Sequence, residues 1–125
     1  MVVLDTCAII EALKPSPSFS TKVYKQIDAG AYILSISFAE IAGKIKLGKL
    51  DMSISTRALF QKLSEVENIS IVDIGVNEWL DSIELAWDEN RDPADRMITA
   101  FAIKNELAIV TTDKKIEKIY SKVIW

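Results

Sequence analysis

The sequence predicts an α/β protein with three layers, α/β/α, in which a central, mostly parallel sheet of four to five strands lies between helices. Short apolar segments rich in Val and Ile alternate along the 125 residues with segments of helical periodicity. The strand segments are apolar throughout, as in parallel sheets that helices cover on both faces. No repeat and no long linker divides the chain, so we expect a single domain over residues 1–125.

Each expected strand but the last is followed by one or two helical segments. We expect strands at Val2–Leu4, Tyr32–Ile36, Ile69–Ile74 and Leu107–Thr111, and an edge strand at Val123–Trp125. Periodicity predicts helices at Cys7–Leu13, Phe19–Ala29, Phe38–Leu47, Ile54–Val66, Val76–Trp87, Pro93–Glu106 and Lys114–Tyr120. Open sheets of this kind bind ligands beyond the carboxyl ends of their strands, so we expect the functional residues there.

The composition excludes several kinds of chemistry. The chain has no histidine, which removes His-based acid–base catalysis and the commonest transition-metal ligand. Its one cysteine, Cys7, allows neither an internal disulfide nor a cysteine-based zinc site. Carboxylates, hydroxyls, lysines or an oxygen-bound metal must therefore carry any reaction. We expect no signal peptide and no membrane span, and hence a cytoplasmic protein.

Basic residues gather beside acidic candidates although the net charge is −3. The clusters are Lys44, Lys46 and Lys49, then Arg91 and Arg96, then Lys114, Lys115 and Lys118. Any one cluster is explained as a solvated helix face. Their repetition next to candidate site acids favours contact with the phosphates of a substrate.

Two aspartates follow expected strands directly. Asp5 comes after the first strand and Asp113 closely after the fourth, so both belong to the edge where a site is expected. Each also has a purely structural explanation, because Asp is a favoured N-cap of the helix that follows it.

Glu40 lies in the first turn after the second strand, in the segment Ser37-Phe38-Ala39-Glu40. This spacing is typical of a capping box, and Lys44 one turn later offers a weak ion pair. The functional alternative is that Glu40 projects toward the same strand ends as Asp5. The two interpretations are compatible.

The segment Arg91-Asp92-Pro93-Ala94-Asp95-Arg96 begins the helix before the fourth strand. Pro93 suits the first helical position and makes Asp92 the expected N-cap. Asp95 then continues the apolar stripe of this helix, where a carboxylate needs a partner. The helix dipole offers part of that compensation, and a metal ion offers more.

Four acids at strand ends or in the first turns after them are the ligands that Mg²⁺ or Mn²⁺ prefers. Four neighbouring anions repel one another unless a cation neutralises them. Spacing alone does not establish that Asp5, Glu40, Asp95 and Asp113 converge, since the chain contains 18 acids.

At these residues the sequence resembles the PIN-domain family, in particular the VapC-like toxin ribonucleases of type II toxin–antitoxin (VapBC) pairs. The similar segments are Leu4-Asp5-Thr6, Ile36–Ala42 running into Lys46–Leu50, Arg91–Arg96, and Ile109–Lys114. Their order, and the 18-residue step from Asp95 to Asp113, make the combination specific. The sequence departs from many relatives at Asn90, where they have histidine, so no role for that histidine is carried over.

The resemblance implies a PIN-like nuclease fold that binds Mg²⁺ or Mn²⁺ through Asp5, Glu40, Asp95 and Asp113, with Thr111 supporting the site. It also implies a homodimer, an RNA substrate and a cognate antitoxin. The expected function is a metal-dependent endoribonuclease that hydrolyses phosphodiester bonds, with Arg96 and Lys114 as possible phosphate contacts. The alternative is a catalytically silent PIN-like module that only engages a protein or RNA partner. A phosphoacceptor receiver domain fits less well, because Asp5 stands alone and Asp73 lies inside a strand segment.

Overall fold

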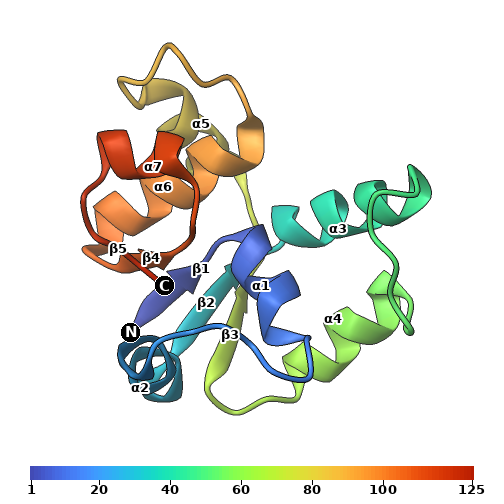
Figure 1. Ribbon diagram of the computed structural model, residues 1–125. Helices are drawn as coiled ribbons and strands as arrows, with labels where there is room; N and C mark the ends of the chain where they lie inside the picture. The colour runs from blue at the N-terminus through green and yellow to red at the C-terminus, as the bar shows by residue number, and fades with distance from the viewer.

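A five-stranded, fully parallel sheet forms the centre of the protein in the computed structural model, which describes residues 1–125 (Figure 1). The strand order is β3-β2-β1-β4-β5. The strands are β1 Val2–Leu4, β2 Ala31–Leu34, β3 Ile69–Val72, β4 Ala108–Val110 and β5 Val123–Ile124. This arrangement confirms the expected parallel α/β sheet, with the C-terminal strand at an edge.

Seven helices connect the strands. They are α1 Thr6–Ala12, α2 Thr21–Ala29, α3 Ile36–Lys46, α4 Thr56–Ser64, α5 Val76–Glu84, α6 Pro93–Asn105 and α7 Lys114–Ile119. None of them is long and apolar enough to cross a membrane. All seven expected helices are present, with ends displaced by a few residues.

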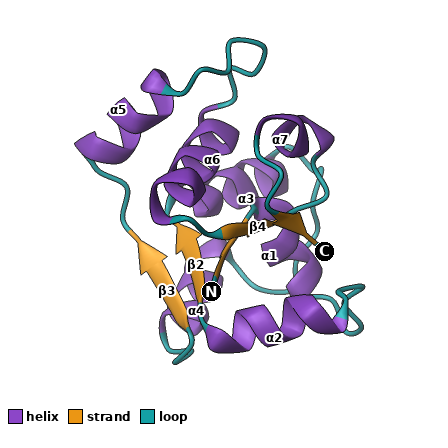
Figure 2. Cartoon of the chain, turned by 90° about the vertical axis from the view of Figure 1, so that its left-hand side faces the viewer, coloured by secondary structure: helices purple, strands orange, loops and turns teal.

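The sheet separates two apolar cores, because successive side chains of a strand point to opposite faces. In β1, Val2 and Leu4 join a core with buried residues of α1–α4, whereas Val3 joins a second core with residues of α6 and α7. The two groups of helices lie on opposite sides of the sheet (Figures 1 and 2). The prediction of three layers is therefore confirmed.

Local sequence fixes where several helices begin and end. The side chains of Ser20, Ser55 and Asp92 cap α2, α4 and α6 by accepting hydrogen bonds from backbone N–H groups. Pro93 occupies the first turn of α6, as expected from its fixed φ and missing N–H. Gly30 ends α2 with a φ of 136°, a conformation that L side chains rarely adopt.

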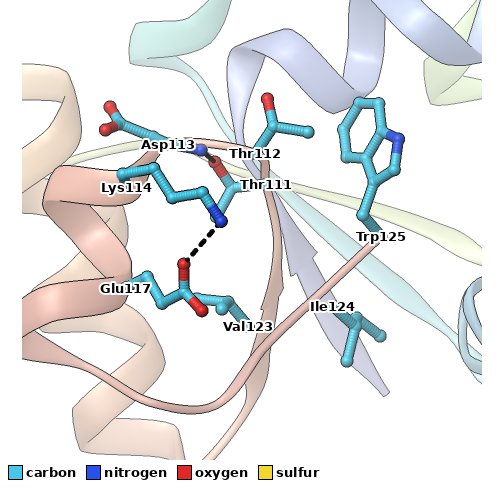
Figure 3. Close-up of a pocket in the computed structure, with 8 residues that line it drawn as sticks. All are labelled: Thr111, Thr112, Asp113, Lys114, Glu117, Val123, Ile124 and Trp125. Atoms are coloured by element: carbon cyan, nitrogen blue, oxygen red, sulfur yellow. Dashed lines mark hydrogen bonds and ion pairs between the residues drawn. The ribbon is translucent and has the colours of Figure 1, made fainter.

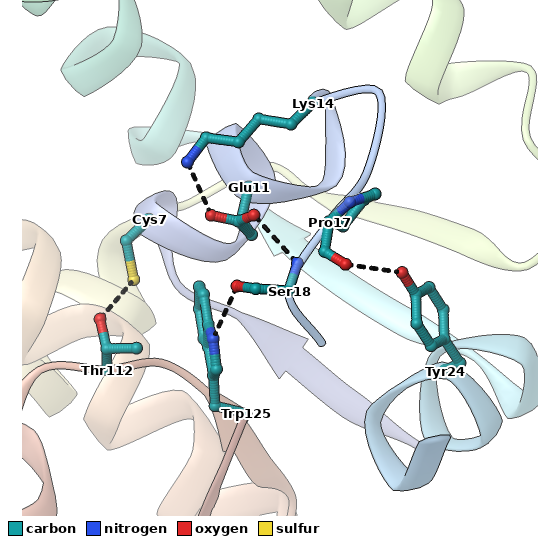
Figure 4. A network of polar contacts seen from close by, with 8 residues as sticks. All are labelled: Cys7, Glu11, Lys14, Pro17, Ser18, Tyr24, Thr112 and Trp125. Carbon is teal, nitrogen blue, oxygen red and sulfur yellow. Dashed lines mark hydrogen bonds and ion pairs between the residues drawn. The ribbon is translucent and has the colours of Figure 1, made fainter. Parts of the chain in front are cut away.

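The connection between α1 and α2 is held by polar contacts (Figure 4) and by Phe19, which joins the apolar core. Glu11 accepts hydrogen bonds from Lys14 and from the backbone N–H of Ser18. The indole N–H of Trp125 donates to Oγ of Ser18 over 3.3 Å. The loop thereby joins the C-terminal end of the chain to the first helix.

Candidate active site

The centre of the candidate site is the carboxyl end of the central strand, β1, and of its neighbour β4. Leu4 pairs with Val110 in the sheet, so the next residues along each strand, Asp5 and Thr111, lie side by side. The buried Asp5 carboxylate accepts a hydrogen bond at Oδ1 from the N–H of Thr6 (2.8 Å). At Oδ2 it accepts one from the hydroxyl of Thr111 (2.7 Å). Asp5 thus caps α1 and at the same time faces the expected ligand region.

Asp113 is joined to this pair through Thr111. The Thr111 hydroxyl oxygen accepts a hydrogen bond from the backbone N–H of Asp113 (3.0 Å) while its proton is donated to Asp5. The Asp113 carboxylate caps α7 by accepting from the N–H of Lys115 (2.8 Å). The buried hydroxyl of Thr111 is therefore hydrogen-bonded to both aspartates, to the carboxylate of Asp5 and to the backbone N–H of Asp113.

Glu40 reaches the same region from α3, through Thr6 rather than through a capping box. The hydroxyl of Thr6 donates to Oε1 of Glu40, and its oxygen lies 2.9 Å from Oγ of the buried Ser37. The predicted capping box is wrong, because α3 begins at Ile36, two residues earlier than that pattern requires, and its N-cap is Ser35. The predicted ion pair with Lys44 is not formed within 4.0 Å; the ion pairs are Lys14–Glu11, Lys104–Asp81 and Lys114–Glu117.

Asp95 lies in the first turn of α6, after the N-cap. As predicted, Asp92 caps the helix, accepting at Oδ1 from the N–H of Asp95 (3.0 Å), and the Asp95 side chain is left for another contact. That contact is Asn90, whose amide Nδ2 donates to Oδ2 of Asp95 over 2.9 Å. Asn90 is buried, with 5% of its surface exposed.

Burial and mutual repulsion make these carboxylates costly to ionise. Desolvation raises the pKa of Asp95 to about 6, and the charges of Asp92, Asp5 and Asp113 act in the same direction. Desolvation likewise raises the pKa of Asp5 and of Glu40, against the hydrogen bonds from Thr111 and Thr6. The charge of Asp5 acts on Glu40 and Asp95, and the charge of Asp113 acts on Asp5 and Asp95, so the four acids belong to one electrostatic cluster.

The cluster fits a hard divalent cation by donor type and charge. All its donors are carboxylate oxygens, and no Lys or Arg forms an ion pair with Asp5, Glu40, Asp95 or Asp113. In the present side-chain positions, no group of three or more acidic or cysteine side chains has the geometry of a metal site. The Asp5 and Glu40 oxygens are directed instead to Thr6 and Thr111. A cation would therefore require these side chains to turn.

Arg96 has a different position from the one expected of a phosphate contact. Its guanidinium donates to four backbone carbonyls: Ser82 (2.9 Å), Leu85 (2.8 Å), Trp87 and Asn90 (2.8 Å). Four of its five N–H donors are thus used within the protein. This geometry favours a structural role for Arg96 over the phosphate contact that the sequence suggested.

Lys114 and the beginning of α7 line a hollow of about 320 Å³ with Thr111, Thr112 and Trp125 (Figure 3). The ammonium of Lys114 is 3.1 Å from Glu117, and its side chain is 85% exposed. An exposed pair of this kind is weak, so Lys114 is free to exchange Glu117 for another anion. The carboxylate of Asp113 points away from the Lys114–Glu117 pair (Figure 3).

Several residues of the site were not identified from the sequence. Thr6 and Asn90 contact the acids directly, and Ser37 contacts Thr6. Cys7 lies beside Asp5, with its Sγ 3.6 Å from Oδ2, and also contacts Thr112 (Figure 4). Burial raises the pKa of the Cys7 thiol, and the Asp5 charge adds to this. Thr6 was within reach of prediction, because it follows Asp5 directly. Asn90 stands two residues before an N-cap, which is a turn pattern and no sign of contact with Asp95.

Comparison with solved structures finds similar folds over the whole chain. A chain of a toxin–antitoxin complex from Klebsiella pneumoniae superposes with a TM-score of 0.64 at 19% identity, covering 100% of this chain and 97% of that one. A chain of FitAB bound to an IR36 DNA fragment gives 0.62 at 18% identity, covering 100% and 94%. FitAcB from Neisseria gonorrhoeae gives 0.58 at 22% identity, covering 100% and 97%.

Comparison with curated proteins finds no match. The family model described as "PIN domain" matches residues 2–122. That range contains strands β1 to β4 and all four candidate acids. The chain belongs to the PIN-domain family.

Proposed function

We propose that this protein is a Mg²⁺- or Mn²⁺-dependent endoribonuclease that hydrolyses RNA phosphodiester bonds. One observation carries the proposal: Asp5, Glu40, Asp95 and Asp113 form a cluster of carboxylates at one sheet edge, and none of them is ion-paired with a Lys or Arg. The charge of Lys44 acts on Glu40 without forming an ion pair with it. Such a cluster is costly to the apo protein and favourable for binding a divalent cation. Membership of the PIN-domain family supports nuclease activity as the use of that site.

We assign Asp5, Asp95 and Asp113 to metal ligation, and Glu40 to ligation or to orienting the attacking water. When bound, the cation lowers the pKa of a coordinated water and polarises the phosphoryl oxygen. Thr111 holds Asp5 and the N–H of Asp113 in place from within the sheet. With no histidine in the chain, proton transfers at the site fall to these carboxylates and to water.

Lysines of α7 are the proposed phosphate contacts. Lys114 borders the hollow beside Asp113. Lys115 and Lys118 line another, of about 380 Å³, with Asn90, and neither forms an ion pair. Asp113 lines the first hollow, and Asn90, whose amide donates to Asp95, lines the second. The lysines therefore lie where phosphates that flank the cleaved bond could be held. Phosphate contacts of this kind position a nucleic acid without selecting its sequence.

The proposed role is that of the toxin of a toxin–antitoxin pair in the cytoplasm, with a cognate antitoxin as partner. The similar fold of a chain from a toxin–antitoxin complex supports this role. We also propose a homodimer. An exposed apolar stripe on α5, formed by Val76, Trp79, Leu80 and Ile83, supports association with protein.

A catalytically silent binding module is the second candidate. It is favoured by the absence of a group of acids already arranged as a metal site. In this case the protein would use the PIN fold only to engage a partner, and free protein would bind no divalent cation.

The test uses purified free protein, an RNA substrate, and Mg²⁺ or Mn²⁺, with EDTA as the metal-free condition. We expect cleavage with either metal, none in EDTA, and at least a ~100-fold loss in Asp5→Asn and Asp95→Asn, since metal stabilisation of a phosphoryl group amounts to several kcal/mol. Asp28→Asn, which changes an exposed acid on α2, is the matched control and should keep full activity.

Two results would contradict the proposal. Unchanged cleavage in Asp5→Asn and Asp95→Asn would trace the activity to a contaminant. Folded wild-type protein that shows no Mn²⁺ binding in calorimetry would establish the silent module instead.

A further inference from the structure

The loop between α5 and α6 is built around Arg96. Its guanidinium binds the carbonyls of Leu85, Trp87 and Asn90, together with that of Ser82 at the end of α5. These acceptors are spread over nine residues of chain that contain no regular structure after α5 ends. Arg96 therefore fixes the backbone of Asn90, whose side chain contacts Asp95.

The side chain of Asn90 is fixed at both polar ends. Its Oδ1 accepts a hydrogen bond from the N–H of Asp92 over 2.9 Å, and its Nδ2 donates to Oδ2 of Asp95 over the same distance. Because an N–H group can only donate, the first contact requires the amide oxygen on that side. The amide nitrogen must then face Asp95.

We propose that Asn90 is a positioning residue of the candidate metal site, which holds the Asp95 carboxylate by one oxygen and leaves the other oxygen free to bind the cation. The proposal rests on the function proposed above. No hydrogen bond within the protein reaches Oδ1 of Asp95, whereas Oδ2 is occupied by the amide. Groups that orient a ligating carboxylate in this way tune metal affinity without touching the metal.

A purely structural role explains only part of this geometry. Asn68 is an example of an asparagine with a purely structural role. Its Nδ2 donates to the backbone carbonyl of Ile27. The backbone carbonyl of Asn90 accepts from Arg96 and its Oδ1 accepts from Asp92, both within the loop. Its side-chain NH2 group instead donates to Asp95, an acid of the cluster. The first two contacts stabilise the loop. The third orients Asp95.

The test compares Asn90→Ala and Asn90→Leu with wild type and with Asn68→Ala, which removes an amide donor at the opposite end of the sheet. Mn²⁺ affinity is measured by calorimetry on free protein, and RNA cleavage is measured across a Mn²⁺ titration. We expect both Asn90 variants to bind Mn²⁺ ~10–100-fold more weakly, the usual cost of losing a partner of a metal ligand. Asn90→Leu keeps the branched outline of the side chain and leaves no cavity, so it covers the case in which Asn90→Ala does not fold.

Raising the Mn²⁺ concentration should restore the rate of the Asn90 variants but not that of Asp95→Asn, because only the latter lacks the ligand itself. Asn68→Ala should keep wild-type Mn²⁺ affinity even where its unfolding temperature falls. A folded Asn90 variant with wild-type affinity and rate overturns the inference and leaves the nuclease intact. Wild-type protein that neither binds Mn²⁺ nor cuts RNA overturns the proposed function, and this inference with it.

Discussion

The hydroxyl of Thr111 donates to Oδ2 of Asp5 over 2.7 Å, although 106 positions separate the two residues in the sequence. The same oxygen accepts the backbone N–H of Asp113. This relationship follows from the parallel pairing of β1 with β4, which brings the ends of the two strands into register. A single buried hydroxyl thus connects two candidate ligands.

Thr111→Val should impair the site while keeping its shape. Valine fills the volume of threonine but leaves Oδ2 of Asp5 and the N–H of Asp113 without this partner. We expect a loss of ~1–3 kcal/mol in the free energy of unfolding and ~10–100-fold in Mn²⁺ affinity. Thr111→Ser keeps the hydroxyl and should retain most of the stability and most of the Mn²⁺ affinity. Thr112→Val, at the exposed neighbouring residue, should change neither the stability nor the Mn²⁺ affinity. Urea unfolding and Mn²⁺ calorimetry check this; equal Mn²⁺ affinity in Thr111→Val and wild type would contradict it.

Asp95 should make the metal-free protein less stable as the pH rises. Its pKa is about 6 in the folded protein and near 3.8 when unfolded, so the unfolded chain loses its proton first. Between these values the folded state holds more protons, and stability falls with increasing pH. Above pH 6 we expect Asp95→Asn to exceed wild type by ~1 kcal/mol, a value reduced for solvent screening of a half-exposed group.

The measurement is urea unfolding in EDTA at pH 4, 5, 6 and 7. The difference between Asp95→Asn and wild type should grow over this range and be smallest at pH 4. Adding Mg²⁺ at pH 7 should reverse the order, because only wild type keeps the full set of ligands. A difference independent of pH would show that the ionisation of Asp95 is not its cause.

Arg96 should contribute to stability rather than to substrate binding. Arg96→Ala leaves four carbonyls without their donor, and we expect a loss of ~3 kcal/mol in the free energy of unfolding. Arg96→Lys should recover little, since one ammonium cannot replace the planar fork. Arg91→Ala, at an exposed arginine of the same segment, should stay within ~0.5 kcal/mol of wild type. If Arg96→Ala kept its stability and lost only affinity for RNA, the phosphate contact would be reinstated.

Gly30 and Gly43 should respond oppositely to alanine. At Gly30 the φ of 136° is unfavourable for alanine, and a Cβ would lie 3.0 Å from Cε of Met1. We expect Gly30→Ala to lose ~1–3 kcal/mol. Gly43 lies inside α3 with nothing near a new Cβ, so Gly43→Ala should gain up to ~1 kcal/mol. Thermal and urea unfolding of the two variants, side by side, test this contrast; a stable Gly30→Ala protein would contradict it.

The fold was predictable because its strands and helices have local signatures. Strand β1 at Val2–Leu4 and the beginning of α6 at Pro93 agree with the prediction to the residue. The errors lie at boundaries between elements of similar composition. Ile36 was expected in a strand but begins α3, because the buried Ser37 contacts Thr6 instead of capping a helix.

The acids of the site were predictable from their positions after strands, whereas their partners were not. The position of Asp92 before proline distinguished the cap from Asp95, and the structure confirms that distinction. The role of Arg96 was missed because its four acceptors are backbone carbonyls, which no side-chain pattern reports. Asn90 was missed for a related reason: the loop that places it depends on Arg96.

The pairing of β1 with β4 also decides when the site comes into existence during synthesis. Thr111 is synthesised 106 positions after Asp5, and Asp113 follows it closely. The strand that positions them pairs with β1 only once the intervening chain is available, and closing so long a loop delays this step further. A growing chain that has not yet reached β4 therefore carries no assembled carboxylate cluster.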